Sequence, residues 1–115
     1  MIDPTHLLEG LGYRIEEYPS DLTVYDVQKA EKTFYLIDSR YEFDYINEQA
    51  IVYLLASIKP VLIHVPLSAP YEEYLASFET FTGFPVSFFV QGGDDGKAAT
   101  KQSLLQRLTF MGMEE

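Results

Sequence analysis

The spacing of hydrophobic residues changes along this chain, from helix-like in some segments to strand-like in others. The pattern predicts four helices and five strands. Helices are indicated where apolar residues recur every three or four positions, and strands where they alternate with period two or form short apolar runs. The predicted helices span residues 3–11, 44–58, 70–82 and 100–110, and the predicted strands span 13–18, 22–27, 34–38, 61–65 and 86–90. A polar hairpin tip over 28–32 joins the second and third strands, with a short helix over 26–32 as the alternative.

The resulting order, α-β-β-β-α-β-α-β-α, predicts a three-layer α/β/α domain with a mixed central sheet. An early antiparallel meander is followed by strands that alternate with helices, which is typical of a mixed sheet covered on both faces. The continuous apolar runs at 34–37 and 61–65 favour central strands, and the stretch Ala50–Ile58 is apolar on nearly every side of its helix. We therefore expect that helix to be packed between layers. Residues 1–115 contain no repeat or linker and predict a single domain.

Composition agrees with a globular protein and removes several classes of function. Apolar residues make up 47% of the chain and aromatic residues 15%, which is too much for a disordered tail. The longest apolar stretch is far shorter than the roughly 20 residues that a membrane span requires. The first residues lack the basic start and apolar core of a signal peptide, so we expect a cytoplasmic protein. The absence of cysteine excludes disulfides, thiolate metal sites and cysteine nucleophiles.

The formal net charge of −10 disfavours nucleic acid as a partner, because an acidic surface repels phosphate backbones at long range. Local clusters of basic residues or bound metal ions could offset that repulsion. Otherwise the charge favours a basic protein partner, or it serves solubility alone.

One constellation of residues resembles a catalytic site. Asp26 and Asp38 are twelve positions apart, Asp38 ends the apolar strand, and Arg40 follows two positions later. If the two aspartates lie on adjacent strands, their carboxylates can share a Mg²⁺ or Mn²⁺ ion, which takes oxygen ligands and keeps several waters. Such an ion polarises a phosphodiester and activates a water, and Arg40 could stabilise the charged transition state. Gln49 and Tyr53, four positions apart on the next helix, would line the site.

The segment DVQKAEKTFYLIDSR followed by QAIVY resembles the PD-(D/E)xK nuclease superfamily, specifically its RecB-like exonuclease branch. The resemblance covers residues 3 to 65 and includes the opening LLEGLGYRIEE, which is similar to the leading helix and first strand of that family. It implies a restriction-endonuclease-like fold. It also implies metal ligation by Asp26 and Asp38, and a site lined by Gln49 and Tyr53.

The lysine of the family motif is replaced by Arg40, which stays protonated and cannot accept a proton. The resemblance is thus to a degenerate member, with weak activity, an altered mechanism, or a fold kept for binding alone. An inhibitor-like or immunity-like acidic module that docks a basic protein is the alternative function. In a purely structural interpretation, Asp38 and Ser39 cap the next helix and Arg40 is a surface cation.

Overall fold

The computed structural model describes residues 4–18, 24–38, 52–65, 83–90 and 101–114, which form a mixed α/β domain around a five-stranded sheet. In chain order the elements are α1 (Pro4–Gly10), β1 (Arg14–Tyr18), β2 (Val24–Lys29), β3 (Lys32–Asp38), β4 (Val61–Val65), β5 (Val86–Val90) and α4 (Lys101–Phe110). Residues 52–56 form a further stretch of helix. The predicted helix over 70–82 and the loop after β5 lie outside the described residues.

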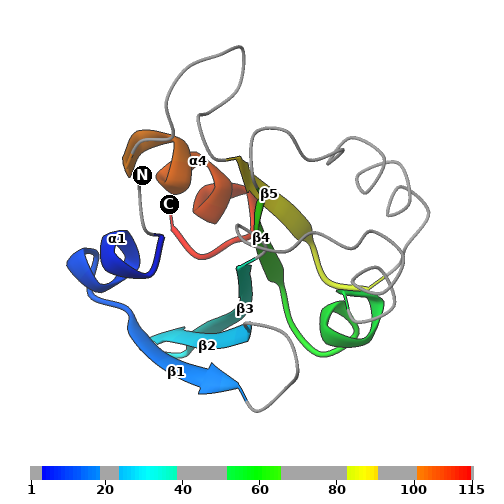
Figure 1. Cartoon of the computed structure of the whole chain (residues 1–115). Helices are drawn as coiled ribbons and strands as arrows, with labels where there is room; N and C mark the ends of the chain where they lie inside the picture. Colours follow the sequence, from blue (N-terminus) through cyan, green and yellow to red (C-terminus); the bar gives the residue numbers. More distant parts are fainter. Residues whose placement is uncertain (1–3, 19–23, 39–51, 66–82, 91–100, 115) are drawn as a thin grey trace.

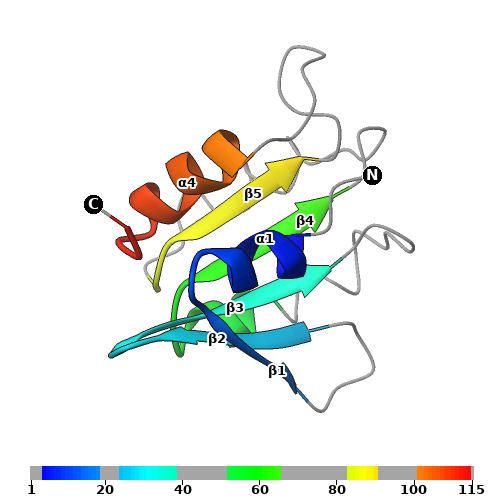
Figure 2. The same cartoon turned by 90° about the vertical axis from the view of Figure 1, so that its left-hand side faces the viewer.

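The strands follow one another across the sheet in the order β1-β2-β3-β4-β5. β2 is antiparallel to both β1 and β3, whereas β3, β4 and β5 are mutually parallel. Of the five strands, β2 alone therefore runs against the others (Figure 2). The mixed sheet expected from the sequence is confirmed, as are the positions of the apolar central strands.

The sheet carries apolar side chains on both faces. α1, α4 and the end of the chain pack against one face, where the buried cluster includes Phe34, Leu36 and Leu62. The helix at 52–56 packs against the other face, where the cluster includes Tyr35 and Ile37. Figure 1 shows α1 and α4 on one side of the strands and the 52–56 helix on the opposite side. Because both faces of β3 are covered, its stretch from Phe34 to Ile37 is apolar at each position.

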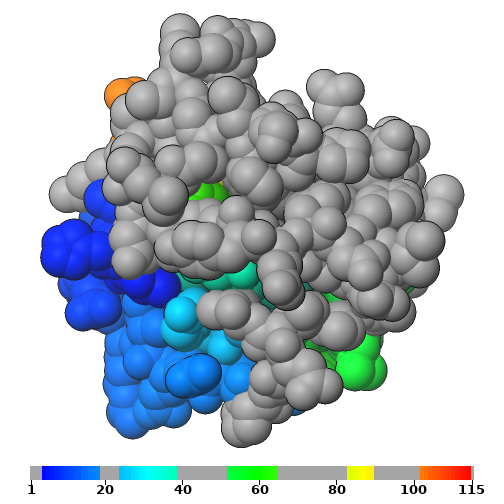
Figure 3. All heavy atoms as spheres, viewed as in Figure 1, coloured from blue at the N-terminus to red at the C-terminus, as the bar shows by residue number. Residues whose placement is uncertain are grey.

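The prediction that the apolar Ala50–Ile58 stretch is packed between layers is wrong for its described part. Helix residues Val52, Leu55 and Ala56 are buried, but Leu54 is 65% exposed and Ile58, in the turn that follows, is 53% exposed. This segment reaches the molecular surface, as the green atoms at the lower right of Figure 3 show. The helix lies on the outside of the sheet and buries a single stripe. Among the described residues, no helix is long and apolar enough to cross a membrane.

The hairpin between β2 and β3 is tighter than the predicted tip over 28–32, and the alternative short helix there is wrong. Gln28 pairs with Thr33 and Lys29 with Lys32, so only Ala30 and Glu31 form the loop. Ala30 has a φ of 57°. A positive φ at the first of two loop residues is the position where type II′ hairpin turns carry glycine.

Replacing Ala30 by glycine should therefore stabilise the protein. The left-handed conformation is strained for alanine but not for glycine, and the relief exceeds the added flexibility of the unfolded chain by about 0.5–1 kcal/mol. Urea unfolding of Ala30→Gly beside the wild type measures this difference. A loss of stability would show that Ala30 is not strained in the turn.

Candidate functional site

Asp26 lies on β2 and forms an ion pair with Lys59, which lies between the 52–56 helix and β4. Lys59 Nζ lies 2.7 Å from Asp26 Oδ1, and the Thr33 hydroxyl donates to the same oxygen at 3.1 Å. Lys59 also donates to Thr33 Oγ1 at 2.8 Å and lies 4.3 Å from the centre of the Tyr35 ring. Both charged side chains are largely covered, with 26% of Asp26 and 14% of Lys59 exposed. Asp26 is thus held by a cation of the protein itself.

The electrostatic environment of Asp26 favours its charged form. Burial raises the pKa of this carboxyl, whereas the hydrogen bond from Lys59 and its positive charge lower it. Hydrogen bonds from Thr33 and Gln28 act in the same direction, and the pKa is lowered overall. The Asp26 carboxylate is therefore already paired with a lysine ammonium.

Asp38, the last residue of β3, lies beside His64 of β4. The two are paired in the parallel register, with Asp38 Oδ1 3.7 Å from His64 Nδ1. Their side chains are 2% and 0% exposed, and the Phe89 ring lies 5.2 Å from the imidazole. Both residues are at the carboxyl ends of adjacent parallel strands, where open α/β sheets usually bind ligands. Their burial, however, makes the pair part of the packed interior.

The structure places Asp26 and Asp38 on opposite faces of the sheet. Asp26 pairs with Tyr35, which belongs to the cluster under the 52–56 helix. Asp38 is three positions after Tyr35, so it shares the face of Leu36, under α1 and α4. Because successive side chains point to opposite faces of a strand, the two carboxylates do not converge, and no single ion can contact both.

The remaining predicted site residues are Tyr53, Arg40 and Gln49, and of these the structure describes Tyr53. Tyr53 is half-buried on the helix that covers the face of Asp26. Arg40 and Gln49 lie outside the described residues. Within the part of the chain that the structure describes, no three residues of the types His, Cys, Asp and Glu are grouped to hold a metal ion. Lys59 was missed, since a lysine before Pro60 reads only as the end of a helix.

The charges are unevenly distributed between the two ends of the strands. β1, β3, β4 and β5 all end at the same edge of the sheet. The segments that start there, residues 19–23, 39–51, 66–82 and 91–100, contain nine acidic and two basic residues. The opposite edge carries Lys29, Glu31 and Lys32 at the β2–β3 hairpin and Lys59 before β4. Negative charge therefore follows the carboxyl ends of the strands.

Comparison of the chain with protein-family models, with curated proteins and with solved structures found no match.

Proposed function

We propose that this protein is a non-catalytic binding module that docks a basic protein partner through the acidic segments that follow β1, β3, β4 and β5 in the chain. The observation that carries the proposal is the position of Asp26 and Asp38 on opposite faces, with Lys59 holding Asp26. A divalent-metal phosphodiesterase of the PD-(D/E)xK kind would need both carboxylates on one ion.

We further infer that the domain is a three-layer α/β/α structure of the restriction-endonuclease-like class. Support comes from the element order, in which a helix and a three-stranded meander precede the parallel strands β4 and β5. Further support is that helices cover both faces of the sheet, with α1 and α4 against one face and residues 52–56 against the other. In this proposal a nuclease-like fold has been kept for binding, and the replacement of the family's lysine by Arg40 fits the loss of catalysis.

The charge distribution favours a basic protein as the partner. Acidic residues concentrated in the segments after four strands, in a molecule with a net charge of −10, speed the encounter with a positive surface and suppress binding to nucleic acid. A partner with a basic patch would meet the segments after β1, β3, β4 and β5. Salt should weaken such binding strongly.

We expect a folded basic protein to bind these acidic segments preferentially. Cytochrome c serves as the probe, with binding measured by calorimetry at low and moderate salt. Neutralising Glu72 and Glu73 by glutamine should weaken binding by about three- to tenfold, because two charges are removed from the contact region. The matched control neutralises Glu9 and Glu31, which are exposed and belong to none of these segments. An equal loss in both variants would show that the net charge alone, and not the acidic segments, causes the binding.

A DNA cleavage assay tests the competing hypothesis of a metal-dependent nuclease. Single- and double-stranded DNA are incubated with Mg²⁺ or Mn²⁺ and either the wild type or Asp38→Ala. We expect no cleavage by either protein and no metal-dependent rise in melting temperature. Cleavage that requires Asp38 would overturn the binding proposal.

A further inference from the structure

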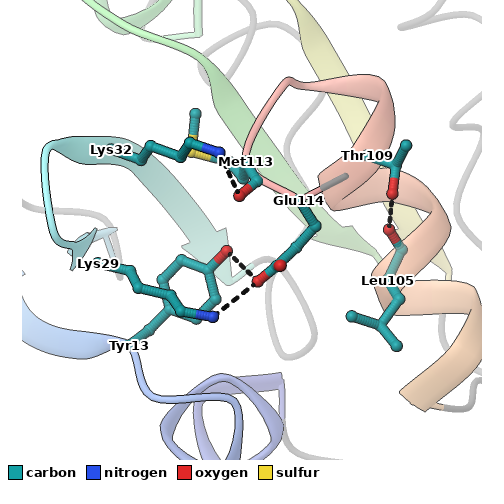
Figure 4. Close-up of polar contacts among 7 residues, drawn as sticks. All are labelled: Tyr13, Lys29, Lys32, Leu105, Thr109, Met113 and Glu114. Carbon is teal, nitrogen blue, oxygen red and sulfur yellow. Dashed lines mark hydrogen bonds and ion pairs between the residues drawn. The ribbon is translucent and has the colours of Figure 1, made fainter.

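A cavity of about 670 Å³ lies between the β2–β3 hairpin and the end of the chain. Residues from the hairpin and from the segment after α4 line it: Lys29, Ala30, Glu31, Lys32, Met113 and Glu114. Figure 4 shows that the side chains of Tyr13, Lys29 and Lys32 converge on the backbone and carboxylate of the last described residues. The cavity lies at the edge of the sheet where β2 ends and β3 begins.

Three donors from separate parts of the chain meet at this place. The Tyr13 hydroxyl donates to Glu114 Oε1 at 2.8 Å, and Lys29 Nζ donates to the same oxygen at 3.1 Å. Lys32 Nζ donates to the Met113 carbonyl at 3.3 Å. The end of the chain supplies the acceptors, a carboxylate oxygen and a carbonyl oxygen. This is the donor arrangement that an oxyanion requires.

The two lysines form an unfavourable pair unless an anion lies between or beside them. Lys29 and Lys32 are direct partners in the β2–β3 ladder, so their side chains leave the same face of the hairpin. Like charges opposite one another destabilise a hairpin. Glu114 neutralises one of the two charges, while Glu31 is exposed at the tip of the turn. Glu31 and Glu114 together balance the two lysines that line the cavity. When Glu114 leaves, the lysines outnumber the one carboxylate that remains, and an incoming oxyanion restores the balance.

Tyr13 is a rigid donor. Its side chain is buried in the cluster of α1 and α4, and its ring packs edge-to-face on Phe34 with centroids 5.8 Å apart. Burial, followed by the hydrogen bond to Glu114 and the charge of that residue, raises the pKa of Tyr13, so the phenol keeps its proton. The hydroxyl is therefore in position before any ligand arrives.

Glu114 can leave these donors without disturbing the fold. The backbone after α4 is fixed because the Met113 amide donates to the Leu108 carbonyl at 2.8 Å and the Met113 side chain lies in the core. The Glu114 side chain is 24% exposed and its pair with Lys29 faces solvent in part. Lys29 is 40% exposed, whereas Lys59 is 14% exposed in its pair with Asp26, so breaking the Lys29–Glu114 pair costs less.

We propose that this cavity is a binding site for an oxyanion group, phosphate or carboxylate, and that Glu114 occupies its donors as an internal substitute. An incoming oxyanion takes the hydrogen bonds of Tyr13 and Lys29, and Lys32 adds its charge. The site uses none of the acidic segments and does not depend on the proposed binding of a basic protein.

The test uses inorganic phosphate and acetate as probes, with binding measured by calorimetry and by amide shifts at low salt. Glu114→Gln removes the competing charge while keeping the size of the side chain. Phosphate should bind this variant about three- to tenfold more tightly than the wild type, the difference expected when one charge-assisted competitor is lost. Tighter binding of phosphate than of acetate identifies a phosphate site, and the reverse identifies a carboxylate site.

Variants in the Glu114→Gln background locate the site. Lys29→Gln and Lys32→Gln should each lose most of the gain. Arg14→Gln, which removes an exposed cation from β1, should retain it. The proposal fails if Glu114→Gln binds neither probe more tightly than the wild type. It also fails if the Arg14 variant weakens binding as much as the lysine variants.

Discussion

Phe34→Ala is expected to destabilise the protein by about 3–5 kcal/mol, the usual cost of deleting a fully buried aromatic side chain. Phe34 is 0% exposed in the cluster shared by the sheet, α1 and α4. It opposes Val27 in the hairpin ladder and supports the ring of Tyr13. Its loss leaves a cavity that these rigid elements cannot fill by collapsing. For a domain stable by about 5–15 kcal/mol, this is a large fraction of the total.

Urea unfolding followed by circular dichroism measures the effect, and Phe110→Ala is the matched control. Phe110 is the last residue of α4 and 64% exposed, so the same chemical change should alter stability by less than about 0.5 kcal/mol. Equal losses in the two variants would mean that the buried position of Phe34 is not occupied in solution. Because Phe34 holds Tyr13 in place, Phe34→Ala should also weaken phosphate binding in the Glu114→Gln background.

Much of the sheet could be predicted because its strands have strong local signals. The run from Phe34 to Ile37 is apolar at each position, and only a strand covered on both faces accommodates that pattern at this length. The 52–56 helix shows the limit of the same reasoning. A continuous apolar run does not reveal which face is buried, and Leu54 and Ile58 turned out to be exposed.

The candidate metal site depended on the register of pairing between β2 and β3, which the sequence does not specify clearly. The loop between β2 and β3 consists of Ala30 and Glu31, and neither residue is a typical signal for a two-residue turn. A shift of one residue in the pairing exchanges the two faces of a strand. The actual register joins Asp26 to Tyr35 and thereby separates it from Asp38. Spacing along the chain could not decide this point.

The partner of Asp26 was equally hidden, since Lys59 is 33 residues away in the sequence. The contact depends on the parallel pairing of β3 with β4, which places Val61 beside Tyr35 and brings the preceding residues over the hairpin. The Tyr35 amide donates to the Pro60 carbonyl at 2.9 Å and fixes this approach. Such a contact follows from the tertiary fold and not from a local motif.

Asp26→Asn should cost about 2 kcal/mol at neutral pH, less than the 3–5 kcal/mol found when one partner of a fully buried ion pair is removed, because this pair is partly exposed. The change leaves the ammonium of Lys59 in a largely covered position with a neutral amide in place of its counter-ion. Glu17→Gln, which removes an exposed carboxylate from β1, is the control and should have little effect. The double variant Asp26→Asn/Lys59→Met should recover part of the loss, since it no longer buries an unpaired charge.

The cost of Asp26→Asn should also depend on pH in a defined direction. The folded pKa of Asp26 is lowered below its ordinary value of 3.8, so the unfolded chain takes up the proton first as the pH falls. The stabilisation by the ionised carboxylate is therefore fully present above the unfolded pKa and is lost as the pH falls through the folded pKa. The difference in unfolding free energy between wild type and Asp26→Asn should be the same at pH 7 and pH 5 and should shrink toward pH 3. A difference that stays constant down to pH 3 would mean that Lys59 does not hold Asp26 in its charged form, and the position of Asp26 would again be open to a metal ion.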